Sequence, residues 1–178
     1  NVEPRIPSLM NSPPQALPYL DTKPVGAAGF YTAINATFRF ILGRFGKEGL
    51  LRYWEDIGSR YYRPVTERWS AGGLPAVAEY WRAFFVAEPG AEVEVQELGE
   101  HVEVRVLTCP MIAHLREQGR EIVPCFCQHC YFVSDAIGRP AGVTVRVEGG
   151  AGSCVQRFYL ATGAPAVQDM NLITEVRS

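Results

Sequence analysis

The sequence contains no run of 18 or more apolar residues, and its first residues lack the basic and then apolar pattern of a signal peptide. Neither a membrane span nor export is therefore expected, and we predict a cytoplasmic protein. An excess of charge is also lacking, because 17 lysine and arginine residues face 19 aspartate and glutamate residues, for a net charge of −2. Without a strong positive field, neither nucleic acid nor an anionic membrane is an expected partner.

Internal repeats and low-complexity runs are absent, and the 178 residues are enough for one domain with its own core. Hydrophobic residues make up 47% and charged residues 20%, which is typical of a globular protein and excludes a disordered chain. Six of the 13 prolines fall within the first 25 residues, so this part cannot sustain a helix. We predict a proline-rich arm over residues 1–25 and a single domain over residues 26–178.

Apolar residues in the first half of the domain recur at helical spacing. Phe30, Ile34, Phe38, Ile41 and Phe45 follow one another at steps of four, four, three and four, which predicts one buried stripe of a helix. A glycine-containing turn should interrupt this helix. A second helix should follow and end before a proline, and a third should carry a proline in its first turn. The first half is therefore predicted to be helical.

Beyond residue 90 the spacing of apolar residues changes from about four to two. Alternation over residues 92–106 and again over residues 143–160 predicts two antiparallel hairpins. Between them, residues 110–119 and the cysteine-rich residues 124–138 each begin with proline, end with glycine and read as helices. We therefore predict an α+β fold with N-terminal helices packed on an antiparallel sheet of two hairpins, and a cysteine-rich helical segment between the hairpins.

Cysteine is the residue type that points to chemistry. The count of five is odd, and four of the five lie within 22 residues of one another, which argues against a disulfide framework. A thiol or metal site in a reducing compartment is the better interpretation. The clustered residues are Cys109, Cys125, Cys127 and Cys130, and the fifth is Cys154.

Cys109 follows a predicted strand and directly precedes the proline that begins a predicted helix. Its thiol should lie near the positive end of the helix dipole, where a thiolate is stabilised and the pKa falls below about 8.5. Such a thiol can act as a nucleophile or as a metal ligand. The alternative is a cysteine that only caps the helix.

Cys127 and Cys130 are three residues apart and share one face of a helix, so together they can bind a single ion. One C-x-x-C pair does not complete a tetrahedral site, and Cys109 and Cys154 are the candidates for the remaining ligands. Zinc is the cofactor we expect, with iron and manganese as alternatives. A thioredoxin-like role would need a preceding strand, which the pattern does not indicate.

His129 lies among the thiols and is the candidate for a general base or a metal ligand, with a hydrogen-bonded core histidine as the alternative. Asp135 could orient such a base, or cap the end of its helix. His101 and His114 are interpreted as structural or surface residues. The GGAG stretch between two predicted strands is no phosphate-binding loop, and we expect it to supply the positive φ of a tight turn.

The order of these motifs resembles the L-2-amino-thiazoline-4-carboxylic acid hydrolase family, and the resemblance extends roughly over residues 30–160. The residues that carry it are Thr108, Cys109 and Pro110, then Cys127 to Cys130, and then Gly150, Cys154 and Phe158. The sequence departs from the family at one point, where Cys-Gln-His-Cys takes the place of the family pattern Cys-x-x-Asp. It implies a hydrolase that opens a small cyclic amidine or thiazoline substrate.

Two mechanisms could open such a ring. The thiolate of Cys109 or Cys127 attacks while His129 moves protons, or thiolates hold a zinc ion whose bound water attacks with help from His129 or Asp135. A site of four thiolates would have no open position and would be structural.

Two further interpretations of the cluster stay open. At Cys154 and Phe158 the chain is also similar to vinyl-reductase-like (4VR) domains, which implies a small-molecule binding or sensory module with cysteine-bound zinc and no turnover. The other is a globular protein with inert cysteines. A small-molecule partner is expected for the hydrolase and for the binding module. Assembly into a homodimer is left open.

Overall fold

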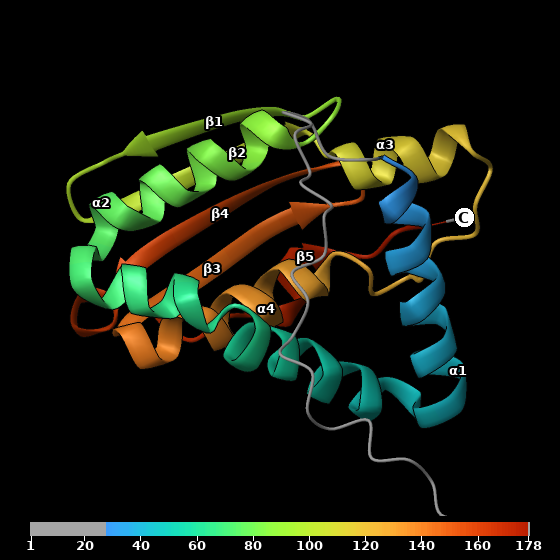
Figure 1. The fold of residues 1–178 in the computed structure, drawn as a ribbon, viewed down its shortest axis with the longest axis horizontal. Helices are drawn as coiled ribbons and strands as arrows, with labels where there is room; N and C mark the ends of the chain where they lie inside the picture. Colours follow the sequence, from blue (N-terminus) through green and yellow to red (C-terminus); the bar gives the residue numbers. More distant parts are fainter. Residues whose placement is uncertain (1–27, 178) are drawn as a thin grey trace, which may run out of the picture.

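The computed structural model describes residues 28–177 of the chain, so the arm predicted over residues 1–25 lies outside the described residues. Two long helices, several short ones and a five-stranded sheet make up the described part (Figure 1). The predicted α+β fold, with helices that precede the sheet, is confirmed. Among the described residues, no helix combines the length and apolar character that crossing a bilayer requires.

The helical first half consists of α1 (Gly29–Asp56), the π-helical turn η1 (Ile57–Tyr61) and α2 (Arg63–Ala87). The expected interruption of the first helix is a kink at Gly46, whose φ is 68°. A second kink lies at Gly73, with φ of 60°. The predicted second helix forms the end of α1 and continues into η1, and the predicted third helix is the part of α2 around and after this kink.

The sheet has the strand order β1-β2-β4-β3-β5, and its first four strands are the two predicted hairpins. Each hairpin is antiparallel, and β2 and β4 join the two hairpins. The fifth strand pairs parallel with β3 and was not predicted. The strands are β1 (Glu92–Glu97), β2 (His101–Thr108), β3 (Val143–Gly150), β4 (Ser153–Leu160) and β5 (Ile173–Thr174).

Two short α-helices connect the hairpins, α3 (Pro110–Glu117) and α4 (Gln128–Gly138). Both begin close to the prolines from which they were predicted. Three short 3-10 turns complete the described secondary structure, at Arg139–Ala141, Ala161–Gly163 and Met170–Leu172.

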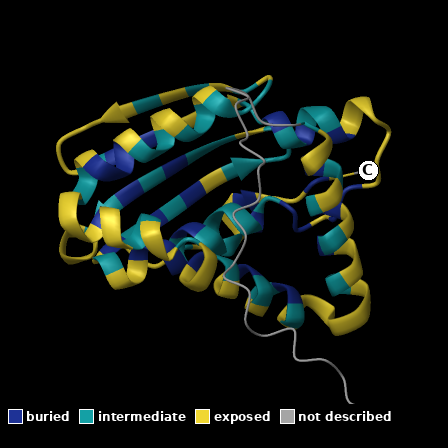
Figure 2. Ribbon diagram, in the orientation of Figure 1, coloured by how far each residue is buried: buried dark blue, intermediate teal, exposed yellow. Residues whose placement is uncertain are grey.

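Two clusters of buried side chains form the core. Figure 2 shows where the buried residues lie along the helices and strands. The sheet cluster lies between the sheet and the helices α2 and α4, and includes Trp69, Val104 and Phe158. The α1 cluster lies against α1 and α3, and includes Phe38 and Phe126. Cys109 and Cys127 each pack against both clusters. The cysteine-rich segment therefore lies where the two parts of the core meet.

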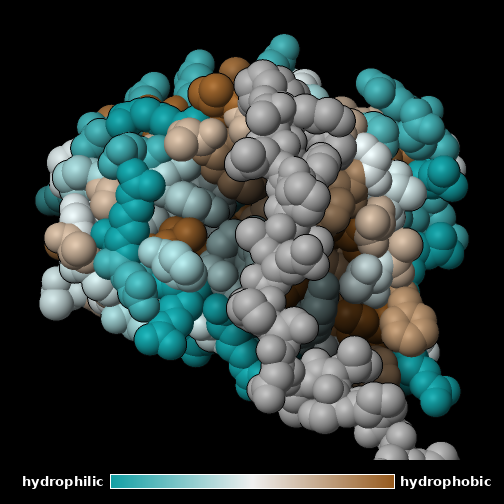
Figure 3. Space-filling view, viewed as in Figure 1, coloured by the Kyte–Doolittle hydropathy of each residue, from teal (hydrophilic) through white to brown (hydrophobic). Residues whose placement is uncertain are grey.

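The predicted apolar stripe of the first helix is only partly correct. Phe38 is buried, and Ile34 and Ile41 are half-buried, but Phe30 and Phe45 are 68% and 60% exposed. The expectation was wrong at both ends because α3 and the cysteine-rich segment cover only the middle of this part of α1. Figure 3 shows further hydrophobic atoms at the upper edge of the molecule, where α2 ends beside β1.

Gly58 in the π-helical turn packs directly against α4. A Cβ atom at this position would lie 2.6 Å from both the Cβ of Ala136 and the carbonyl oxygen of Val133. We expect Gly58→Ala to lower the free energy of unfolding by about 1–3 kcal/mol, because α4 would have to move. Urea denaturation measures this change.

The matched control is Gly43→Ala in α1, where a Cβ atom meets nothing within 4 Å. Alanine at an exposed helical position should leave the stability unchanged or raise it by up to about 1 kcal/mol. Equal effects of the two substitutions would contradict the close packing of η1 on α4.

Candidate functional site

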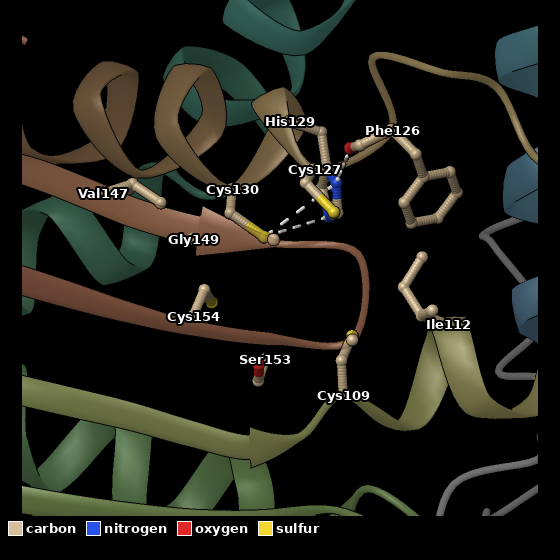
Figure 4. Close-up of a pocket in the computed structure, with 12 residues that line it drawn as sticks. Cys109, Ile112, Phe126, Cys127, His129, Cys130, Val147, Gly149, Ser153 and Cys154 are labelled. Atoms are coloured by element: carbon tan, nitrogen blue, oxygen red, sulfur yellow. Dashed lines mark hydrogen bonds between the residues drawn. The ribbon is translucent and has the colours of Figure 1, made fainter. Parts of the chain in front are cut away.

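Four of the five cysteines line one small cavity between the two hairpins and α4 (Figure 4). Cys109 comes from the junction of β2 and α3, Cys127 and Cys130 from the start of α4, and Cys154 from β4. The cavity has a volume of about 20 Å³. Because one water molecule needs roughly 10–15 Å³ measured in this way, the cavity has room for a single small atom. Three separate segments thus place four cysteines in the wall of one cavity.

Local structure explains why each thiol reaches the cavity. Cys109 is the residue before the first turn of α3, and its backbone N–H donates a hydrogen bond of 2.8 Å to the carbonyl of Gly152. Cys127 directly precedes α4, and Cys130 lies in its first turn. On β4, Cys154 pairs with Val106 and points to the same side of the sheet as the buried Phe158.

The turn between β3 and β4 wraps around the thiols. Its residues 149–152 all have positive φ, including Ala151 at 53°, so the expected role of the GGAG stretch is confirmed. This conformation lets the backbone N–H of Ala151 donate to the sulfur of Cys127 at 3.2 Å. A Cβ atom at Gly150 would lie 2.5 Å from the carbonyl oxygen of Thr174, so only glycine fits there.

The C-terminal segment closes the site from another side. Ile173 and Thr174 form β5 and pair with the end of β3, at the residues that enter the turn. The backbone N–H of Val176 donates a 2.8 Å hydrogen bond to the carbonyl of Pro124, just before the first cysteine of the cluster. Residues 173–176 therefore help to hold the cysteine-rich segment in place.

Burial dominates the acid–base properties of the four thiols. It raises the pKa of Cys109 to about 11 and those of Cys127 and Cys130 to about 12, and it raises the pKa of Cys154 further. For Cys109, Cys127 and Cys154, neighbouring thiols of the cluster add to the rise. All four are therefore neutral thiols at pH 7 in the metal-free protein.

The expectation that the pKa of Cys109 falls below that of a free thiol is wrong. The amides of Met111 and Ile112, at the start of α3, do lower it, as does the charge of Arg116. Desolvation outweighs them, because the thiol is enclosed by α4 and by the β3–β4 turn as well as by its own helix.

Cys125 does not belong to the cavity. It is buried in the α1 cluster, 6% exposed, beside residues such as Phe126 and Val123. Burial raises its pKa as well, while the positive charge of Lys47 opposes the rise. The structure thus separates Cys125 from the four cysteines that the sequence names as candidate ligands.

His129 lies at the edge of the cavity as a hydrogen-bonded core residue. Its Nδ1 atom is 2.6 Å from the carbonyl oxygen of Phe126, so this nitrogen carries the proton and donates it. The sulfur of Cys130 is 4.0 Å from Nδ1 and 3.7 Å from Nε2. Since the two distances are nearly equal, the sulfur lies beside the ring and not along the lone pair of Nε2.

The surroundings of His129 keep its ring neutral. It contacts the rings of Phe38, Trp54 and Phe126. Burial among them lowers the pKa of His129. Of the two interpretations of this residue, the placement agrees with a core histidine and gives it no position from which to accept a proton from Cys130.

Asp135 is not brought to the thiols. It lies outside the lining of the cavity and forms an ion pair of 3.0 Å with Arg139, the residue that follows α4. Burial raises its pKa and the charge of Arg139 opposes this. A role in orienting a base beside the cysteines does not fit this position. His101 stacks on Tyr159 and His114 packs against Tyr31, as expected of structural residues.

The side chains of the described part of the chain are not placed as a finished metal site, since no three histidine, cysteine, aspartate or glutamate residues form a group that could hold an ion. The donor chemistry nevertheless fits zinc, because thiolates are ligands that zinc prefers and four of them complete a tetrahedron. Iron bound by four thiolates also fits. Manganese prefers oxygen ligands, and no carboxylate lines the cavity.

Alkylation tests the protonation state of Cys109. With a pKa of about 11, about one Cys109 in a thousand is a thiolate at pH 8 in the folded, metal-free protein, against roughly a quarter of an ordinary thiol. We expect its labelling by iodoacetamide, followed by mass spectrometry, to be slow at pH 8 and to accelerate about tenfold for each pH unit up to about pH 11. Fast labelling below pH 8 would show that burial does not control this thiol.

Comparison with known proteins gives no relative from which a role could be taken. The resemblance to the thiazoline hydrolases therefore stays a prediction, and function has to be argued from the thiol cluster itself. No protein-family model matches the chain, and no curated protein matches it either.

Proposed function

We propose that the chain is a small-molecule binding or sensory module, without turnover, built around a structural metal centre. In this proposal Cys109, Cys127, Cys130 and Cys154 hold one metal ion, for which zinc is the best match. The observation that carries the proposal is the convergence of four thiols, from three separate segments, on a cavity with room for one atom. Binding requires their side chains to turn further toward that cavity.

The energetics of the cluster support a cation at this place. Four half-buried thiols are costly to ionise one by one, because each negative charge would lie in a poorly solvated space beside the others. A divalent cation removes this obstacle, since it takes the place of the protons that the thiols release. When bound, zinc would supply a tetrahedral cross-link between the chain segments that carry its ligands.

The position of the cluster supports a structural role for the metal. Cys109 and Cys127 pack against both the sheet cluster and the α1 cluster, so an ion bound by them would join the two halves of the core. Four thiolates would also fill the coordination sphere and leave no place for a reacting water.

A groove between the end of α2 and the edge strand β1 supports the binding role. Its volume is about 410 Å³, within the range of about 300–1,000 Å³ that is usual for small-molecule sites. Phe85, Val86, Val93 and Val95 line it with apolar surface. Arg82, which is ion-paired with Glu97, and Glu88, which accepts a hydrogen bond from the Tyr31 hydroxyl, add one charge of each sign.

The hydrolase implied by the resemblance is the alternative to this proposal. It needs an ionised nucleophile and a space beside it for a five-membered ring. The thiol cavity of about 20 Å³ is far smaller than such a ring, and burial keeps Cys109 protonated. These two facts favour the structural centre over the catalytic one.

Metal analysis of the purified protein tests the proposal. We expect close to one zinc ion per chain, and the loss of most of it when any one of the four cavity cysteines is replaced by serine, because each supplies one ligand. Cys125→Ser is the matched control and should keep the full metal content, since this residue lies in the α1 cluster. Elemental analysis by mass spectrometry counts zinc and iron together.

Three results would contradict the proposal. One is a metal-free wild-type protein whose thermal midpoint is not raised by added zinc. Another is an equal loss of metal in Cys125→Ser and in Cys109→Ser. The third is turnover of a cyclic thiazoline by the wild type that Cys109→Ser abolishes without unfolding the chain, which would favour the hydrolase.

A further inference from the structure

Gln156 is a buried polar residue next to the thiol cluster. It lies on β4 two residues after Cys154, and therefore points to the same side of the sheet. Its neighbours on the adjacent strands are Val104 and Val147, and only 3% of its surface is exposed. A polar amide thus occupies a position where the neighbouring strands carry valine.

The hydrogen bonding of this amide is incomplete in the described structure. Its Nε2 atom lies 4.0 Å from the sulfur of Cys154, and its Oε1 atom is buried without a partner. A long contact to a neutral thiol offsets little of the free-energy cost of burying an amide, because thiol sulfur is a poor hydrogen-bond acceptor. The arrangement becomes favourable only if the sulfur carries a negative charge.

We propose that Gln156 is a positioning residue of the metal centre, whose side-chain N–H donates to the metal-bound sulfur of Cys154. The inference rests on the proposed function, since it assigns Gln156 to the same site. A thiolate that binds a metal keeps lone pairs that accept hydrogen bonds, and such outer partners hold the ligand in the orientation that the metal requires.

A second sulfur of the cluster has a comparable donor. The backbone N–H of Ala151 points at Cys127 with a donor–sulfur distance of 3.2 Å. Both donors belong to the β3–β4 hairpin, one to its turn and one to its second strand. The hairpin therefore supplies an N–H group to two of the four sulfur atoms, and Gln156 is the one that a side-chain substitution can remove.

Gln128 provides a matched control. It is buried to the same degree, with 5% of its surface exposed, and its Oε1 atom also has no partner among the described residues. No hydrogen bond in the described part joins its side chain to a cysteine. Gln128→Leu and Gln156→Leu therefore remove the same chemical group from two buried positions, only one of which faces a thiol.

Zinc affinity is measured by competition with a chromophoric chelator for wild type and both variants. We expect Gln156→Leu to weaken zinc binding by about 10-fold or more, and Gln128→Leu to leave it within about twofold. The urea midpoint of metal-free Gln156→Leu should not fall, because leucine removes an unpaired buried carbonyl. A residue that acted only through core packing would not combine weaker metal binding with unchanged metal-free stability.

Cobalt substitution adds a readout at the sulfur itself. The N–H group lowers the energy of the thiolate lone pairs, so its removal should move the sulfur-to-cobalt charge-transfer band of Gln156→Leu to lower energy. If the leucine variant does not fold, Gln156→Met removes the same donor with a flexible side chain.

Unchanged zinc affinity and an unchanged charge-transfer band in the Gln156 variant would overturn the inference and leave the metal centre intact. An equal loss of affinity in Gln128→Leu would overturn it as well, by showing a general effect of the core. A wild-type protein that binds neither zinc nor cobalt would refute the proposed function, and with it this role of Gln156.

Discussion

The cost of ionising buried sulfur governs the site. Four thiols face a space with room for one atom, and burial raises the pKa of each above the range in which a free thiol ionises. In the proposed metal centre, the cluster would have two stable states, one with four protons and one with a cation in their place. Desolvation keeps the thiols neutral, and a bound cation would let them ionise because it compensates the charge of the thiolates.

The fold places this cluster where it affects the whole domain. Cys154 is fixed by the register of β4 between β2 and β3, and Cys109 by the end of β2. The other two thiols come from the start of α4, which packs against α1, the π-helical turn and β3. Because the sheet cluster and the α1 cluster meet at the cysteines, whatever holds the sulfur atoms together also holds the core together.

Patterns among residues close in sequence predicted the strands and helix starts of the fold. Contacts between distant segments determined burial and the pKa values of the thiols. The alternating valines of β2 and β3 predicted the two hairpins, and the Cys109–Pro110 junction predicted the start of α3, since strand period and helix start depend on neighbours in sequence. The exposed Phe45 and the high pKa of Cys109 could not be foreseen, because burial is set by segments far along the chain. The pairing of β5 with β3 could not be predicted either, because a strand of two residues is too short to show an alternating pattern.

The requirements of a nucleophile and those of a structural ligand conflict at this site. A thiol that attacks a substrate has to be ionised and reachable before the substrate arrives. A thiol that serves as a structural ligand needs only to lose its proton when the metal arrives, and enclosure then protects the bond. Cys109 and Cys127 are enclosed by the turn at residues 149–152 and neutral at pH 7, so they satisfy the second requirement and fail the first. The groove at the end of α2, which has the volume that the thiol cavity lacks, is then the better place for a small molecule to bind.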